Sequence, residues 1–236
     1  MSPQRGPNLP YKLVAGVTPV RSKWLVASAK MAGSTFAPED PRVYDTFREV
    51  VDMRPPFASI VVNAPIGYRE DNAKGPRRCD FEARVLLDKR GRFLRKTPTR
   101  ETLQRGYALP EDRLDAITLM LMPSFVEVFN EMSAYRQRVV YEGTPELSFY
   151  QLNAEKPLLY SKHSIEGREE RWSLLIKRIN GIERVLDAQL KGVSTEHLTD
   201  AAMLLVTARR VLAHAAKRIP VHPEWDSEGL RMELVY

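Results

Sequence analysis

The sequence predicts an α/β fold, in which a mixed sheet opens with an antiparallel hairpin and is flanked by helices. Two short apolar runs, residues 12–17 and 24–29, are joined by a brief turn-like link, which is the pattern of a hairpin. Ala58 to Val62 form a continuous apolar run, as expected of a strand that is buried on both faces. Residues 195–218 repeat apolar side chains at helical spacing. Strands and helices in this mixture favour a sheet covered by helices.

The elements of the first half follow from the spacing of apolar residues and helix breakers. Residues 1–10 are polar and contain proline, so we expect a flexible tail. After the hairpin, Phe36 marks a third strand. The segment 43–53 carries apolar side chains at helical spacing, which predicts an amphipathic helix. Pro55 and Pro56 end that helix before the buried strand.

The second half is mostly helical. Thr144 and Pro145 have the types that begin a helix, and the cluster Ile117 to Met122 is apolar on nearly all sides, as in a buried core helix. The predicted elements are helices over 77–87, 110–134, 145–152, 166–190 (one or two) and 195–218, with strands over 138–141 and 229–236. We therefore expect one domain over residues 11–236, with a basic helical insertion at about 69–135.

Composition restricts the class of protein. The chain has 236 residues, of which 43% are hydrophobic and 28% charged, so it can bury a sizeable core. No apolar run is long enough to span a bilayer, and the first residues lack the apolar segment of a secretory signal. A single cysteine, Cys79, excludes an internal disulfide. We expect a cytoplasmic protein that does not contact membranes.

Positive charge is concentrated between Arg69 and Arg105. This stretch holds twelve basic and six acidic residues, an excess equal to the formal net charge of +6. Such a patch attracts phosphates by releasing their counterions, which makes Arg77, Arg78 and Arg84 candidates for nucleic-acid contact. The alternative is a solvated face that only keeps the protein soluble. The basic residues are Arg69, Lys74, Arg77, Arg78, Arg84, Lys89, Arg90, Arg92, Arg95, Lys96, Arg100 and Arg105.

Four carboxylates have positions that suit a metal site. Glu142 closes a predicted strand, Glu146 lies in the first turn of the next helix, and Asp200 lies one turn after Glu196 on the long helix. Carboxylates that converge in this way can hold a hard divalent cation such as Mg²⁺ or Mn²⁺. Two such ions can clamp the attacking and leaving oxygens of a phosphodiester. The alternative is that Glu146 only favours its helix N-terminus and that Glu196 and Asp200 are solvated.

Short segments spread over nearly the whole chain resemble one family in order and spacing. They are Val14–Val17, Trp24–Ala27, Asn63–Gly67, Arg78–Asp80 with Ala83 and Arg84, Glu142 with Pro145–Phe149, Lys162 with Gly167, Arg168 and Arg171, Leu198–Ala201, and Leu230–Glu233. They resemble segments of a family of uncharacterised proteins that share a domain of unknown function. Members of this family are described as predicted nucleases with a ribonuclease-H-like fold. The resemblance implies such a fold here. It also implies metal ligands at Glu142, Glu146 and Asp200, and it makes Lys162 and Arg168 further candidates for phosphate contact.

Two positions depart from the family pattern. The family's first strand resembles Gly-Val-Asp, and its aspartate would be a metal ligand, but this chain has Thr18 there. The strand before Pro-Ile-Gly usually ends in aspartate, and here it ends in Asn63. Threonine and asparagine offer oxygen without charge, so two formal negative charges are missing from a site that needs them to hold Mg²⁺. We expect a degenerate site at which Mg²⁺ or Mn²⁺ binds weakly, if it binds.

Three hypotheses about function follow. The first is a ribonuclease-H-like protein with a degenerate metal site that retains nucleic-acid or nucleotide binding. The second is an active metal-dependent nuclease with Glu142, Glu146 and Asp200 as ligands. The third is an interaction scaffold without catalysis, because fold alone does not determine function.

Overall fold

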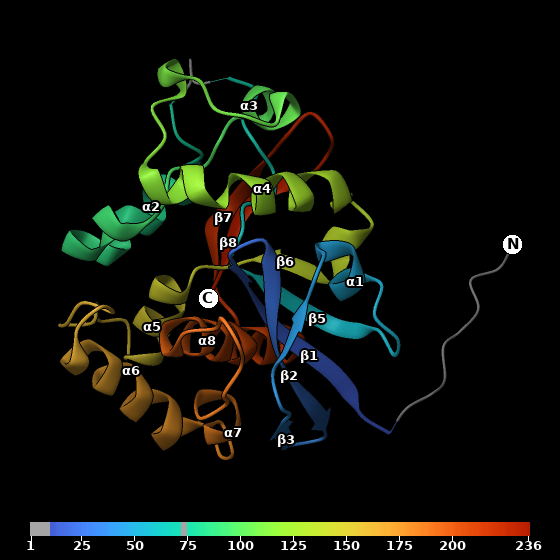
Figure 1. The fold of residues 1–236 in the computed structure, drawn as a ribbon, viewed down its shortest axis with the longest axis vertical. Helices are drawn as coiled ribbons and strands as arrows, with labels where there is room; N and C mark the ends of the chain where they lie inside the picture. Colours follow the sequence, from blue (N-terminus) through green and yellow to red (C-terminus); the bar gives the residue numbers. More distant parts are fainter. Residues whose placement is uncertain (1–9, 72–74) are drawn as a thin grey trace, which may run out of the picture.

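The computed structural model describes residues 10–71 and 75–236, and within them the chain builds a mixed sheet with helices on both faces (Figure 1). The order of the strands in the sheet is β3-β2-β1-β5-β6, and β4 pairs with β2. β2 runs antiparallel to β1, β3 and β4, whereas β5 is parallel to both β1 and β6. The strands are β1 (Lys12–Val20), β2 (Lys23–Ala32), β3 (Thr35–Pro38), β4 (Arg42–Tyr44), β5 (Phe57–Val62) and β6 (Val140–Glu142). The predicted mixed α/β fold with an opening hairpin is confirmed.

Helices cover the sheet in two layers. The α-helices are α1 (Phe47–Val51), α2 (Arg78–Leu87), α3 (Arg100–Arg105), α4 (Ala116–Glu131), α5 (Pro145–Leu152), α6 (Ile165–Arg178), α7 (Glu183–Leu186) and α8 (Thr195–Leu212). The described residues also form short 3-10 helices, η1 (Asp88–Phe93), η2 (Pro110–Asp112) and η3 (Arg136–Arg138). One core lies between the sheet and α6, α7 and α8, and a second lies between the sheet and α1 and α4. The connection from β5 to β6, where we expected a basic insertion, contains α2, α3 and α4.

A second antiparallel pair, β7 (Arg218–Trp225) and β8 (Arg231–Val235), packs on α2. Of the expected tail, only Pro10 belongs to the described residues. Among those residues, no helix combines the length and the apolar character that a membrane span requires.

Gly16 brings the long helix α8 against the central strand β1. A Cβ atom at Gly16 would lie 2.1 Å from the backbone nitrogen of Leu205 and 2.2 Å from the carbonyl oxygen of Ala201. Only glycine allows two backbones to approach this closely. The contact also holds α8 close to β1 next to Asp200, the neighbour of Ala201, so this packing helps to build the site described below.

We expect Gly16→Ala to lower the free energy of unfolding by roughly 1–3 kcal/mol, because α8 would have to move away from the sheet. Ser59→Ala on the adjacent strand is the matched control. Its hydroxyl is buried without a hydrogen-bond partner, so its removal should be neutral or slightly stabilising. Urea unfolding followed by circular dichroism measures both, and equal stability of Gly16→Ala and the wild type would contradict the close packing.

Two predicted helices have different bounds in the structure. The segment predicted as one helix over 43–53 begins as the edge strand β4, and the helix α1 begins only after Thr46, whose hydroxyl caps it. The helix predicted over 195–218 ends at Leu212, and the strand β7, which was not predicted, begins at Arg218. The first pattern included residues of β4 that pair with β2, and the second ran past the end of α8 to the first residue of β7.

The apolar helix of the middle segment is less buried than its composition suggested. Leu121 and Met122 are buried, but Ile117, Leu119 and Met120 are 52%, 47% and 69% exposed. The interpretation of this cluster as a fully buried core helix is therefore wrong. One face of α4 packs on the sheet, and the other carries apolar side chains that face solvent.

Candidate functional site

The carboxyl ends of three parallel strands meet at one edge of the sheet. Thr18 lies near the end of β1, Asn63 follows β5, and Glu142 ends β6. The Asn63 side-chain amide donates a hydrogen bond to the Thr18 hydroxyl at 3.2 Å, and its backbone N–H donates to the carbonyl of Val17 at 2.8 Å. Asn63 and Glu142 also line a common small pocket. Ligands of open α/β sheets bind outside such strand ends.

Glu142 leaves the sheet on the opposite face from Thr18. It pairs in register with Val62, which packs in the core beneath α1 and α4. Thr18 follows Val14 by four residues on β1, so it lies on the same face as Val14, which packs against α8. Side chains alternate between faces along a strand, so the two point to different sides. The strand ends therefore lie at one edge of the sheet, but the side chains of Glu142 and Thr18 project from opposite faces and do not converge on one site.

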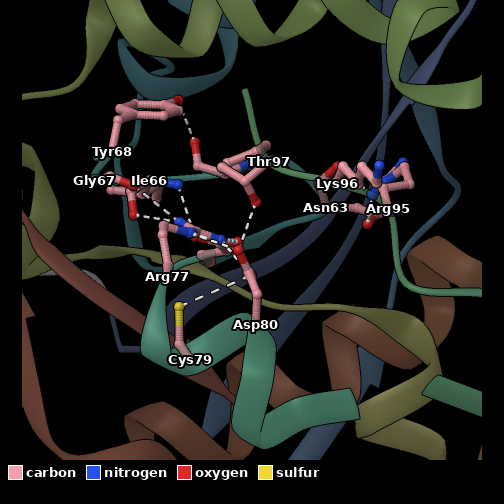
Figure 2. A network of polar contacts seen from close by, with 12 residues as sticks. Asn63, Ile66, Gly67, Tyr68, Arg77, Cys79, Asp80, Arg95, Lys96 and Thr97 are labelled. Atoms are coloured by element: carbon pink, nitrogen blue, oxygen red, sulfur yellow. Dashed lines mark hydrogen bonds and ion pairs between the residues drawn. The ribbon is translucent and has the colours of Figure 1, made fainter. Parts of the chain in front are cut away.

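The Glu142 carboxylate is held by a buried guanidinium. Arg77, which is 2% exposed, donates to Glu142 at 2.7 and 2.8 Å and to Asp80 at 2.8 and 3.0 Å. Its Nη1 also donates to the carbonyls of Ile66 and Gly67, and Thr97 donates to Asp80 at 2.8 Å (Figure 2). Burial raises the pKa of Glu142, and the Arg77 guanidinium opposes that rise.

A second guanidinium sits on the Asn63 side chain. Nη2 of Arg95 donates to the side-chain and main-chain oxygens of Asn63, and its guanidinium lies 5.6 Å from the centre of the Phe125 ring. In Figure 2 the Asn63–Arg95 pair lies to one side of Arg77 and Asp80. Within the described part of the chain, Arg95 forms no ion pair with a carboxylate. Burial lowers the pKa of Arg95, although the charges of Asp200 and Glu142 oppose this.

The two remaining acidic candidates also have basic partners. Asp200, buried on α8, lies 3.3 Å from Nζ of Lys162, which is 2.9 Å from Glu196. Glu146, at the start of α5, pairs with the buried Arg171 at 2.7 Å. Burial raises the pKa of Asp200; Lys162 opposes this, and the nearby Glu146 and Glu196 add to it. Burial alone would lower the pKa of Lys162, but Asp200 and Glu196 outweigh it and raise that pKa.

These side chains line a groove along the strand ends, which we call the edge groove. Its central pocket, of about 100 Å³, is lined by Asn63, Arg95, Glu146, Lys162 and Asp200 among others. A pocket of about 40 Å³ continues from Asn63 and Arg95 to Glu142, and one of about 300 Å³ continues from Lys162 and Asp200 to Arg168. The groove thus joins almost all the positions at which the resemblance implied ligands or their neutral replacements.

The comparison with protein families identifies the chain. A family model described as "Protein of unknown function (DUF429)" matches residues 16–225. The chain belongs to the DUF429 family. No curated protein and no solved structure matches the chain. The DUF429 description names no activity, so function has to be argued from the edge groove itself.

Most basic side chains of the expected phosphate-binding stretch are engaged within this DUF429 protein. Arg77 is buried on two carboxylates, the exposed Arg78 pairs with Glu82, and Arg84 donates to the carbonyls of Leu94 and Arg95. Further intramolecular contacts are made by Arg69, Arg90, Lys96, Arg100 and Arg105. Lys74 lies outside the described residues. The stretch mainly holds the insertion together, so a continuous phosphate track along it has little support.

The residues of the DUF429 site do not fit a divalent cation. Glu142, Glu146 and Asp200 each have a basic partner within 3.3 Å, and among the described residues no group of three or more His, Cys, Asp or Glu side chains could hold a metal. A divalent ion would have to displace these cations, and Thr18 and Asn63 would offer it no charge. Arg95, which the sequence reasoning counted only as one of twelve basic residues, lines the central pocket and is the candidate site residue that it missed.

Proposed function

We propose that this DUF429 protein is a ribonuclease-H-like protein with a degenerate metal site, and that its edge groove binds a phosphate-bearing ligand, a nucleic acid or a nucleotide, without a metal ion. The fold assignment is supported by the mixed sheet, which opens with antiparallel strands and continues with parallel ones. It is further supported by the family positions Thr18, Asn63 and Glu142 at the strand ends and Asp200 on α8.

One observation carries the proposal: basic side chains occupy the place where the resemblance implies metal ions. Arg95 sits on Asn63, and Lys162 sits on Asp200, and both line the central pocket. A metal ion at such a site neutralises phosphate charge. Guanidinium and ammonium groups can do the same through charge-assisted hydrogen bonds, and arginine does it in a geometry matched to phosphate oxygens. Binding therefore survives the loss of the metal ligands, whereas metal-activated attack on a phosphodiester does not.

The test is a calorimetric titration of the whole protein with Mg²⁺ and with Mn²⁺, followed by gel shifts of a single-stranded oligonucleotide in the presence of a chelator. We expect no metal binding in the millimolar range, and oligonucleotide binding that weakens as salt rises. Metal binding in that range, lost in Asp200→Ala, would instead favour the active nuclease that uses Glu142, Glu146 and Asp200. If neither an oligonucleotide nor a nucleotide binds at low salt, the proposed function is wrong and the result favours the hypothesis of an interaction scaffold without catalysis.

A further inference from the structure

The central pocket contains a cation, Arg95, that has no carboxylate in direct contact among the described residues. Arg95 directs only Nη2 at Asn63, so Nη1 and Nε keep donors for another partner. Among the described residues, the buried arginines Arg77, Arg100 and Arg171 are each paired with a carboxylate. The carboxylates of Asp200 and Glu142 act on Arg95 only from a distance, so this partly buried charge is less well compensated than one in direct contact with a carboxylate. An anionic ligand would supply that compensation.

Lys162 gives the pocket a second cation from a distant part of the chain. It lies between Asp200 and Glu196 with its side chain one-third exposed, so it can turn toward a ligand without unfolding its surroundings. Both carboxylates that line the pocket, Glu146 and Asp200, are already engaged, by Arg171 and by Lys162 respectively. An anion in the pocket therefore meets Arg95 and Lys162, together with Arg90, which also lines it, and no carboxylate without a basic partner.

The first turn of α5 forms another wall of the pocket. Thr144 and Pro145 line it, and the Thr144 side chain does not cap the helix. Uncapped N–H groups at a helix start attract anions. The start of α5 adds to the attraction that Arg95 and Lys162 exert on an anion, and it would not indicate an anion site without them.

The size and lining of the pocket narrow the kind of anion. With a volume of about 100 Å³ the pocket has room for one phosphoryl group and part of the group attached to it, which suits the end of a ligand better than a run of backbone phosphates. The outer wall is apolar, with Phe93 44% and Ile117 52% exposed. Exposed aromatic side chains beside a phosphate site are where bases stack.

We propose that the central pocket binds a phosphate monoester, the terminal phosphoryl group of a nucleotide or of a nucleic-acid strand, on Arg95 and Lys162, with the attached nucleoside against Phe93 and Ile117. The inference rests on the proposed function and specifies its ligand. A monoester offers three terminal oxygens to share among Arg95, Lys162 and the start of α5. An internal diester offers two, and its chain must leave the pocket on both sides.

The experiment is calorimetry on the whole protein at low salt with a chelator present, using adenosine monophosphate, adenosine, inorganic phosphate, and one oligonucleotide with and without a terminal phosphate. We expect adenosine monophosphate and the phosphorylated strand to bind, and adenosine and the unphosphorylated strand to bind at least about tenfold more weakly, since each lacks the charge-assisted hydrogen bonds. Arg95→Gln and Lys162→Gln should each weaken monophosphate binding by about tenfold. Lys89→Gln removes one charge from the same basic stretch outside the pocket and should have less than about a twofold effect.

The outcomes separate this inference from the proposed function. If both oligonucleotides bind equally and adenosine monophosphate does not bind, the terminal-phosphate site is wrong and the proposed function stands. If no ligand binds, both are wrong. If inorganic phosphate binds as tightly as adenosine monophosphate, the binding of a phosphoryl group by Arg95 and Lys162 is supported, and the placement of the nucleoside against Phe93 and Ile117 is overturned. Unchanged melting temperatures of the Gln variants show that weaker binding does not come from unfolding, and recovery of binding in Arg95→Lys supports a role of charge.

Discussion

Arg77→Met is expected to lower the free energy of unfolding by about 3–5 kcal/mol, because it leaves buried carboxylates without their counter-charge. Arg77 is 2% exposed, and Glu142 and Asp80 are 6% and 7% exposed. Methionine keeps an unbranched side chain but donates no hydrogen bond to the two carboxylates or to the carbonyls of Ile66 and Gly67. Urea unfolding followed by circular dichroism measures the change.

The neighbouring arginine provides the control. Arg78 pairs with Glu82 at the surface, so Arg78→Met should lower the stability by less than about 1 kcal/mol. Adding Glu142→Gln to Arg77→Met should recover part of the loss, because one buried charge disappears. If the two single methionine variants were equally stable, the buried network around Arg77 would not have the structural role assigned to it.

Restoring the two missing aspartates is not expected to restore metal binding by itself. In the double variant Thr18→Asp with Asn63→Asp, the new carboxylate at position 63 meets the Arg95 guanidinium, which already lies on that side chain. An ion pair forms there, and a divalent ion would have to displace an arginine. Adding Arg95→Ala removes this competitor and leaves three carboxylates, at positions 18, 63 and 200, near one edge of the sheet.

We expect the triple variant to bind Mn²⁺ at least about tenfold more tightly than the double variant, a difference of about 1.4 kcal/mol or more. The repulsion between a guanidinium and a metal ion a few ångströms apart is large enough for this effect, since two unit charges at 4 Å interact by about 4 kcal/mol near a protein surface. Calorimetric titration measures the affinities, with Arg95→Ala alone as the control for new binding elsewhere. Tight Mn²⁺ binding by the double variant would show that Arg95 does not occupy the metal position.

The sequence predicted those parts of the fold that local patterns encode. The hairpin of β1 and β2 and the buried strand β5 follow from apolar runs and a tight turn, and the start of α5 follows from Thr144 and Pro145. It failed at the bounds of two predicted helices. The helix predicted over 43–53 included Val43 and Tyr44 of β4, which pair with β2, and the helix predicted over 195–218 ran past Leu212 to the first residue of β7, a strand that was not predicted.

The candidate site was predicted by position and not by electrostatics. The resemblance placed Thr18, Asn63, Glu142 and Asp200 near one edge, and the structure brings Thr18 and Asn63 into contact. Which cation lies on which side chain depends on residues as far apart as Arg77 and Glu142, and no local spacing reports such a pair. The excess of arginine between residues 69 and 105 was the available signal, but it did not single out Arg95 as an arginine whose Nη1 and Nε have no hydrogen-bond partner among the described residues.

A crystal soaked in Mn²⁺ together with a nucleoside monophosphate tests the central claim most directly, because the anomalous signal of manganese distinguishes a metal ion from a phosphoryl group. We expect density for a phosphoryl group between Arg95 and Lys162, and no manganese at the carboxyl ends of β1, β5 and β6. A manganese ion bound there by Asp200 or Glu142, with Lys162 or Arg77 displaced, would contradict the account.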